Sequence, residues 1–109
     1  MNPSRIEQLE KFLEQNPDDS FVKYALAMEY IKLGDDATAL RFFISVLEKD
    51  PDYTGTYYHL GKLYLRMKNR TLAEETYREG MKRTYGKEQH AYAELQQALN
   101  DLLFDEADD

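Results

Sequence analysis

The chain has 109 residues, of which 42% are hydrophobic and 32% are charged, and its formal net charge is −7. This length predicts one domain, and this composition predicts a folded soluble protein rather than a disordered chain. The acidic balance excludes a general nucleic-acid binder, which needs a basic surface, and an apolar run of about 18 residues, as a membrane span requires, is absent.

The first predicted helix covers residues 4–17, where Ser4 and Glu7 have the spacing of a capping box. The preceding residues lack the basic and then apolar layout of a secretory signal. The chain has no cysteine, which excludes disulfides and thiol chemistry. We therefore expect a cytoplasmic protein without a membrane partner.

Apolar residues recur at spacings of three and four along the rest of the chain, which predicts further helices. These cover residues 20–33, 36–49, 54–68, 71–83 and 88–104. Gly34 is placed to end one of them in a left-handed conformation, and Pro51 follows the end of another. Thr71 and Glu74 have the spacing of a second capping box. The acidic residues 105–109 are predicted to form a solvated tail.

The chain matches itself when it is shifted by 34 residues, and such a period indicates a helical repeat. Most of the residues that fall on one another are identical or similar, and the pairs are Leu26 and Leu60, Ala27 and Gly61, Tyr30 and Tyr64, Ala39 and Ala73, Phe43 and Tyr77, Val46 and Gly80, Pro17 and Pro51. The same shift relates residues 4–17 to the second half of a repeat.

This pattern resembles the tetratricopeptide repeat (TPR) family. The resemblance implies an all-α fold, a right-handed superhelix of stacked antiparallel helical hairpins with about six helices. One domain would cover residues 1–104, with a half-repeat helix at 4–17, repeats at 20–53 and 54–86, and a capping helix at 88–104. The chain departs from the family pattern at Lys68, at Tyr85, and at Lys23, where the family favours a large aromatic residue and the next repeat has Tyr57.

Glycine is a poor helix residue, so Gly61 inside a predicted helix requires an explanation. The two helices of a hairpin approach most closely at one point, and a small residue there lets them pack. We therefore expect Ala27, Gly61, Ala39 and Ala73 at the close approaches. Tyr57, Leu60 and Tyr64 share one helical face and are predicted to lie in the core.

The resemblance also implies a function, because TPR proteins usually bind a peptide or helix in the concave groove lined by the first helix of each repeat. The chain is therefore predicted to be a non-enzymatic protein-interaction module, an adaptor or scaffold. Its expected groove residues are Phe21, Tyr24, Met28, Ile31, Tyr58, Lys62, Leu65, Arg66 and Gln97. Lys62 and Arg66 lie one helical turn apart and are expected to hold a carboxylate.

Two alternatives stay open for this surface. The aromatic residues can pack against the neighbouring repeat instead, and the two cations can pair with nearby acids. The carboxylate clamp that TPR proteins use for chaperone C-termini is not expected, because Tyr24, Met28 and His59 stand where that clamp needs lysine or asparagine. Self-assembly, as a homodimer through the terminal helices, is the alternative function.

Metal and catalytic sites are not expected. The segment DPDYTG at 50–55 resembles the start of a calcium loop, but Gly61 stands where the bidentate glutamate is needed. His59 and His90 have no spacing of a local zinc motif and are predicted to be surface histidines. No phosphate loop, nucleophile elbow or metalloprotease motif is present. We therefore expect no enzyme, no metal and no cofactor.

Overall fold

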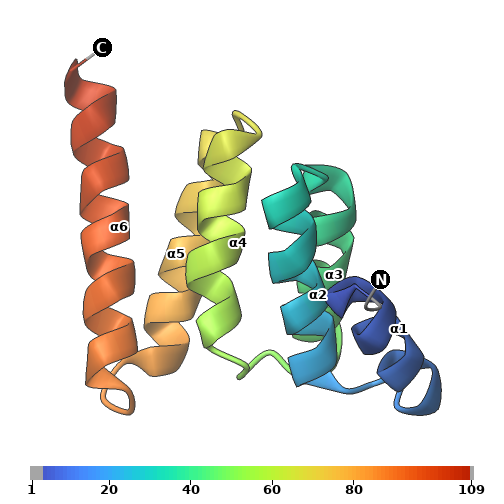
Figure 1. Ribbon diagram of the computed structural model, residues 1–109. Coiled ribbons are helices and arrows are strands. Elements are labelled where there is room, and N and C mark those ends of the chain that lie inside the picture. Colours follow the sequence, from blue (N-terminus) through green and yellow to red (C-terminus); the bar gives the residue numbers. More distant parts are fainter. Residues whose placement is uncertain (1–3, 109) are drawn as a thin grey trace. The chain divides into compact units, whose positions relative to one another are not determined.

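The computed structural model describes the backbone of residues 4–108 and the side chains of residues 4–104, and this part of the chain contains six helices and no strand (Figure 1). The helices are α1 (Arg5–Gln15), α2 (Ser20–Leu33), α3 (Asp36–Lys49), α4 (Gly55–Arg66), α5 (Arg70–Thr84) and α6 (Gln89–Asp108). They form two compact units, Met1–Tyr53 and Thr54–Asp109, which are described separately.

In the first unit, α2 packs against both α1 and α3. Each of these three helices begins at a side chain that accepts a hydrogen bond from a backbone N–H three residues later, at Ser4, Asp19 and Asp35. These caps satisfy backbone donors that have no partner within the helix. Gly34 ends α2 in the predicted left-handed conformation, with φ of 80°. The core residues without exposed surface are Leu26, Ala27, Ala39, Phe43 and Val46.

In the second unit, α5 packs against α4 and α6. Lys68, which replaces the helix-ending glycine, also adopts a left-handed conformation, with φ of 65°. The predicted capping box at Thr71 and Glu74 is wrong, because α5 begins one residue earlier, at Arg70. The cap is Asn69, whose side-chain oxygen accepts a hydrogen bond from the backbone N–H of Leu72 at 3.1 Å. Asparagine is among the preferred residues at this position.

The last helix continues to Asp108, four residues beyond the end predicted at 104. The added segment DEAD contains no glycine or proline that would end a helix. Before this segment, Arg70 of α5 contacts α6, because its Nη2 donates a 2.7 Å hydrogen bond to the backbone carbonyl of Leu102. The predicted solvation of the acidic side chains at 105–109 concerns side chains outside the described residues.

Gly61 and Gly80 let aromatic rings approach the backbone in the second unit. A Cβ atom at Gly61 would lie 2.6 Å from Cδ1 of Tyr77, and one at Gly80 would lie 2.6 Å from Cβ of Tyr57. Two carbon atoms that are not bonded to each other do not come this close. The small residue at Gly61 is therefore required by the Tyr77 ring, as the helix-packing argument predicted. Tyr57 and Leu60 lie in the core, whereas Tyr64 is half-buried.

We expect Gly61→Ala to lower the free energy of unfolding. Overpacking costs about 1–3 kcal/mol, and alanine gains only about 1 kcal/mol in helix propensity. Gly55→Ala is the matched control, because a Cβ there meets no atom within 4 Å. Urea denaturation of the two variants measures the difference. Equal stability of both variants would contradict this explanation of Gly61.

His59 makes stability depend on pH. Burial lowers the pKa of its imidazole below the usual 6.5, and the Glu94 carboxylate opposes this with a smaller effect. The unfolded chain therefore binds a proton on His59 at a higher pH than the folded chain does. The contribution of His59 to stability is complete above the unfolded pKa and is lost as the pH falls toward the lowered folded pKa.

We therefore expect the wild type to lose more stability than His59→Gln between about pH 7.5 and about pH 5.5. Urea denaturation at both pH values measures this double difference, which cancels the carboxylates common to both proteins. An equal loss in both proteins would show that His59 does not carry this effect.

Candidate functional site

The second unit contains a hollow of about 330 Å³ between α4 and α6. Two residues of α4 line it, Tyr58 and Lys62, which lie one helical turn apart. The residues of α6 come from one face of the helix at spacings of three and four: His90, Ala93, Glu94, Gln97, Ala98 and Asp101. We call this set of eight residues the α4–α6 groove.

Cation and acid groups are separated within the α4–α6 groove. The Lys62 Nζ lies over the Tyr58 ring, 5.5 Å from its centroid, which is a cation–π arrangement. On α6, the Gln97 amide donates a 2.9 Å hydrogen bond to Asp101, and His90 Nε2 lies 3.8 Å from Glu94. The groove therefore offers one cation from α4 and two carboxylates from α6, beside an aromatic ring.

Tyr77 of α5 lies close to the same region. Its side chain has no exposed surface, and its hydroxyl has no hydrogen-bond partner among the residues that the structure describes. Burial, followed by the neighbouring Tyr58 and Asp101, raises the pKa of Tyr77 to about 12. The hydroxyl therefore stays protonated at neutral pH. The groups that the groove exposes are suited to hydrogen bonding, ion pairing and ring contact.

The structure brings together three of the nine predicted groove residues: Tyr58, Lys62 and Gln97. Tyr58 is half-buried, and the other two are exposed. Leu65 and Arg66 lie near the end of α4, in the same unit, but they do not line the hollow. They stay candidates for contact beyond it.

The remaining four predicted residues lie on α2 in the first unit. Phe21 is 57% exposed, and Met28 and Ile31 are half-buried. The Tyr24 ring packs within its own unit, with its centroid 6.1 Å from that of Phe43 and 5.6 Å from that of Tyr53. Part of the Tyr24 ring is therefore covered by its own unit, in agreement with the alternative that the aromatic residues pack within the protein. A role of these four residues in binding stays a prediction.

The sequence-based prediction did not include the acids of the groove. Glu94 and Asp101 lie three residues before and four residues after Gln97, on the same face of α6. Helical spacing from Gln97 would have found them. The prediction placed Gln97 on this face of the last helix but did not include these two acidic neighbours.

Neither a membrane-spanning helix nor a metal cluster is present in the described part of the chain. No helix there is long and apolar enough to cross a membrane. No group of three or more histidine or acidic side chains in residues 4–104 is arranged to hold a metal ion.

Comparisons with known proteins agree with the helical fold. Residues 2–104 match the profile of the family described as Tetratricopeptide repeat. A tetratricopeptide repeat domain protein from Salinibacter ruber, solved by crystallography, is 42% identical, with a TM-score of 0.73 over 77% of this chain and 94% of that one. The solution structure of a Bordetella parapertussis protein is 25% identical, with a TM-score of 0.84 over 97% and 93% of the two chains.

The type III secretion translocator chaperone SycD of Yersinia enterocolitica has the same fold, with a TM-score of 0.86 over 94% of this chain and 72% of that one, at 12% identity. Among curated proteins no match was found. The profile match and the Salinibacter ruber structure confirm the predicted family and its all-α helical-repeat fold. Proteins of this family generally act as protein-interaction modules rather than as enzymes. The chain belongs to the tetratricopeptide repeat family.

Proposed function

We propose that the chain is a non-enzymatic adaptor that binds a peptide segment of a partner protein in the α4–α6 groove. The observation that carries this proposal is the convergence of a half-buried tyrosine, a cation and two carboxylates on one hollow. Tyrosine provides a large contact area at a low cost in side-chain entropy. Charged groups around it select a partner by its own charges.

The charges of the groove favour a segment with a basic side chain. Glu94 and Asp101 both point acceptor groups to the hollow, and Asp101 already holds the Gln97 amide in place. An arginine of the partner would meet carboxylates that match its planar donors. Lys62, on the opposite wall, is left to bind a backbone carbonyl or an acidic residue of the same segment. This extends the sequence-based expectation, which considered only a carboxylate held by Lys62 and Arg66.

We expect Tyr58→Ala to weaken peptide binding about tenfold, because truncated aromatic residues at the centre of an interface cost more than about 1 kcal/mol. Peptides are first selected on the wild type from a display library, and their dissociation constants are then measured by calorimetry. The double variant Glu94→Gln, Asp101→Asn is expected to bind peptides with a basic residue more weakly. Its affinity for their neutral analogues should not change.

Lys87→Glu is the control for charge reversal, because Lys87 is exposed in the α5–α6 connection and does not line the groove. It should bind the selected peptides as the wild type does, with an unchanged thermal melting curve. Selected peptides that bind Tyr58→Ala and the double acid variant as tightly as the wild type would exclude this groove.

The alternative function, self-assembly as a homodimer, is favoured by apolar side chains on the terminal helices. Phe12 of α1 is 51% exposed, and Phe104 of α6 is 71% exposed next to Leu103 at 37%. Large exposed apolar side chains of this kind often belong to contacts between molecules.

For a dimer formed through α6, we expect the mass measured by sedimentation equilibrium to rise with protein concentration. We also expect Phe104→Ser to raise the dissociation constant of the dimer about tenfold. Phe12→Ser tests α1 in the same way, and Phe21→Ser, on α2, is the control for loss of an exposed aromatic side chain. A monomer mass at all concentrations would remove this alternative.

A further inference from the structure

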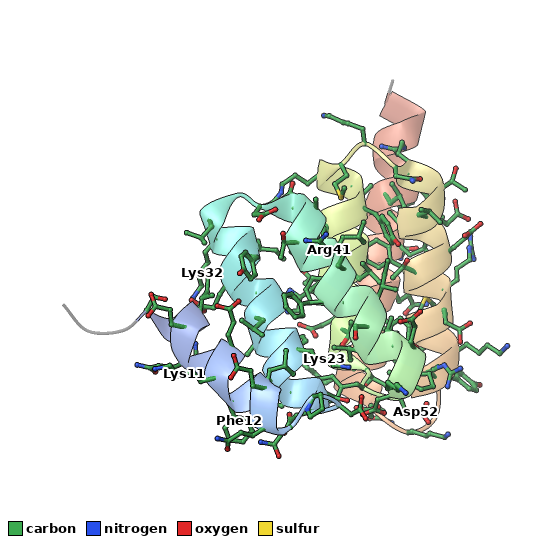
Figure 2. All side chains as sticks on the ribbon, turned by 90° about the vertical axis from the view of Figure 1, so that its right-hand side faces the viewer. Lys11, Phe12, Lys23, Lys32, Arg41 and Asp52 are labelled. Atoms are coloured by element: carbon green, nitrogen blue, oxygen red, sulfur yellow. The ribbon has the colours of Figure 1, made fainter. Side chains whose placement is uncertain are left out.

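The first unit contains a second hollow, of about 630 Å³, formed by α1, α2 and α3 and the turn after α1. Figure 2 faces this side of the unit and labels Lys23 and Arg41, which both line the hollow. The full lining is Glu10, Leu13, Pro17, Lys23, Tyr30, Asp35, Thr38, Arg41, Phe42 and Ser45. We call this the Lys23 trough.

Lys23 is the unusual residue of the trough, because it is a charged side chain in the core. Only 6% of its surface is exposed. Within residues 4–104, its ammonium group takes part in no ion pair and no side-chain hydrogen bond. Its ammonium nitrogen is not among the fully buried polar atoms without a partner, so the stem lies in the core while the charged end meets the hollow. The Lys23 trough therefore presents a cation that has three hydrogen-bond donors and no protein acceptor.

The second repeat has different residues at the positions that correspond to Lys23 and two other residues of the trough. The 34-residue shift relates Lys23 to Tyr57, Arg41 to Glu75 and Ser45 to Glu79. Tyr57 is 4% exposed, and its Cβ and Cγ atoms lie against the backbone at Gly80. An aromatic ring and two acids in one repeat thus correspond to a lysine, an arginine and a serine in the other. The Lys23 trough, whose lining contains two cations and two acids, belongs to the first unit and is not a general consequence of the repeat.

The other polar groups of the trough are largely engaged with one another. Asp35 is the cap of α3, and it accepts hydrogen bonds from both the backbone N–H and the hydroxyl of Thr38, at 3.2 and 2.8 Å. Arg41 Nη2 donates a hydrogen bond of 3.2 Å to the same hydroxyl oxygen. Glu10 of α1 adds an exposed carboxylate to the lining. Lys23 is therefore the cation without an internal acceptor.

We propose that the Lys23 trough binds an extended peptide segment of a partner protein through one acidic residue, whose carboxylate accepts hydrogen bonds from the Lys23 ammonium. Along α3 the lining runs from Asp35 to Ser45, which is about 15 Å at the helical rise. This matches four or five residues of extended chain, at about 3.3 Å each. The trough is rimmed by exposed residues, so a chain can continue beyond it.

The composition of the trough also limits the number of charges on the segment. Leu13 and Phe42 offer apolar surface on either side, which suits the neighbours of the acidic residue. Glu10 and Asp35 would repel a second acid or a phosphate group. The segment is therefore one acid flanked by apolar and small polar residues. This proposal does not depend on the α4–α6 groove, which lies in the other unit and favours a basic residue.

The test uses two acetylated and amidated pentapeptides of leucine and serine, one with a central glutamate and the other with a central glutamine. Each is titrated into the full chain labelled with ¹⁵N, and backbone and lysine side-chain signals are followed by NMR. We expect the glutamate peptide to shift the signals of Thr38, Ser45 and the Lys23 side chain. The glutamine peptide is expected to bind about tenfold more weakly, because it lacks the charge-assisted hydrogen bond.

Three variants separate the charge of Lys23 from its shape. Lys23→Met removes the charge and keeps the length, and Lys23→Tyr introduces the residue that the second repeat uses at this place. Both are expected to bind the glutamate peptide about tenfold more weakly than the wild type. Lys11→Met is the matched control, since Lys11 lies on α1, is exposed and does not line the trough. Its affinity should equal that of the wild type.

The proposal is overturned if both pentapeptides bind the wild type equally, or if Lys23→Met and Lys11→Met have the same affinity for the glutamate peptide. Sodium acetate is titrated as a carboxylate that is not part of a peptide. If acetate binds as tightly as the glutamate peptide, the trough does not recognise a peptide segment, and that part of the proposal is overturned. Lys23→Met is the safer variant for folding, because Tyr57 lies against Gly80 in the second repeat, whereas Val46 stands at the corresponding position here. Melting curves of all variants identify any protein that fails to fold.

Discussion

The close approach of α5 to its neighbours is the constraint on which the second unit depends. Tyr77 of α5 presses on the backbone of α4 at Gly61, and Tyr57 of α4 presses on the backbone of α5 at Gly80. Each ring needs the glycine of the other helix, so the two contacts fix the rotation of both helices. Tyr58 follows Tyr57 by one residue and is turned by about 100° on the helix. This rotation places it in the α4–α6 groove rather than in the core.

The first unit meets the same constraint with different residues, and the difference produces the Lys23 trough. Ala27 and Ala39 have no exposed surface and provide the small residues of the hairpin. The partners of Tyr57 and Gly80 in this repeat are Lys23 and Val46. A lysine stem is slimmer than a tyrosine ring, and its charged end avoids full burial. The repeat therefore keeps its backbone packing while one position changes from a core aromatic residue to a cation that lines a hollow.

The parts of this fold that could be predicted from sequence are those that local chemistry decides. Gly34 ends α2 because only a few residue types adopt a left-handed conformation easily, and Gly61 marks a close approach because no other residue fits. The start of α5 was missed because Asn69 and Thr71 are both good caps, and the choice between them depends on where α5 packs. Glu94 and Asp101 were within reach of sequence reasoning, because they lie three residues before and four residues after Gln97, which was already placed on this face of the last helix.

The two hollows show how a repeat protein can present two different sets of charged side chains without changing its fold. The α4–α6 groove has two carboxylates and one lysine, whereas the Lys23 trough has an arginine, two carboxylates and a lysine without an internal acceptor. Lys23 and Tyr57 occupy the same position of the 34-residue period, so a single substitution at a packing position can turn part of the core into the lining of a hollow. A net charge of −7 therefore does not describe either hollow. The charge that a partner meets is set locally, by a few side chains on one face of a helix.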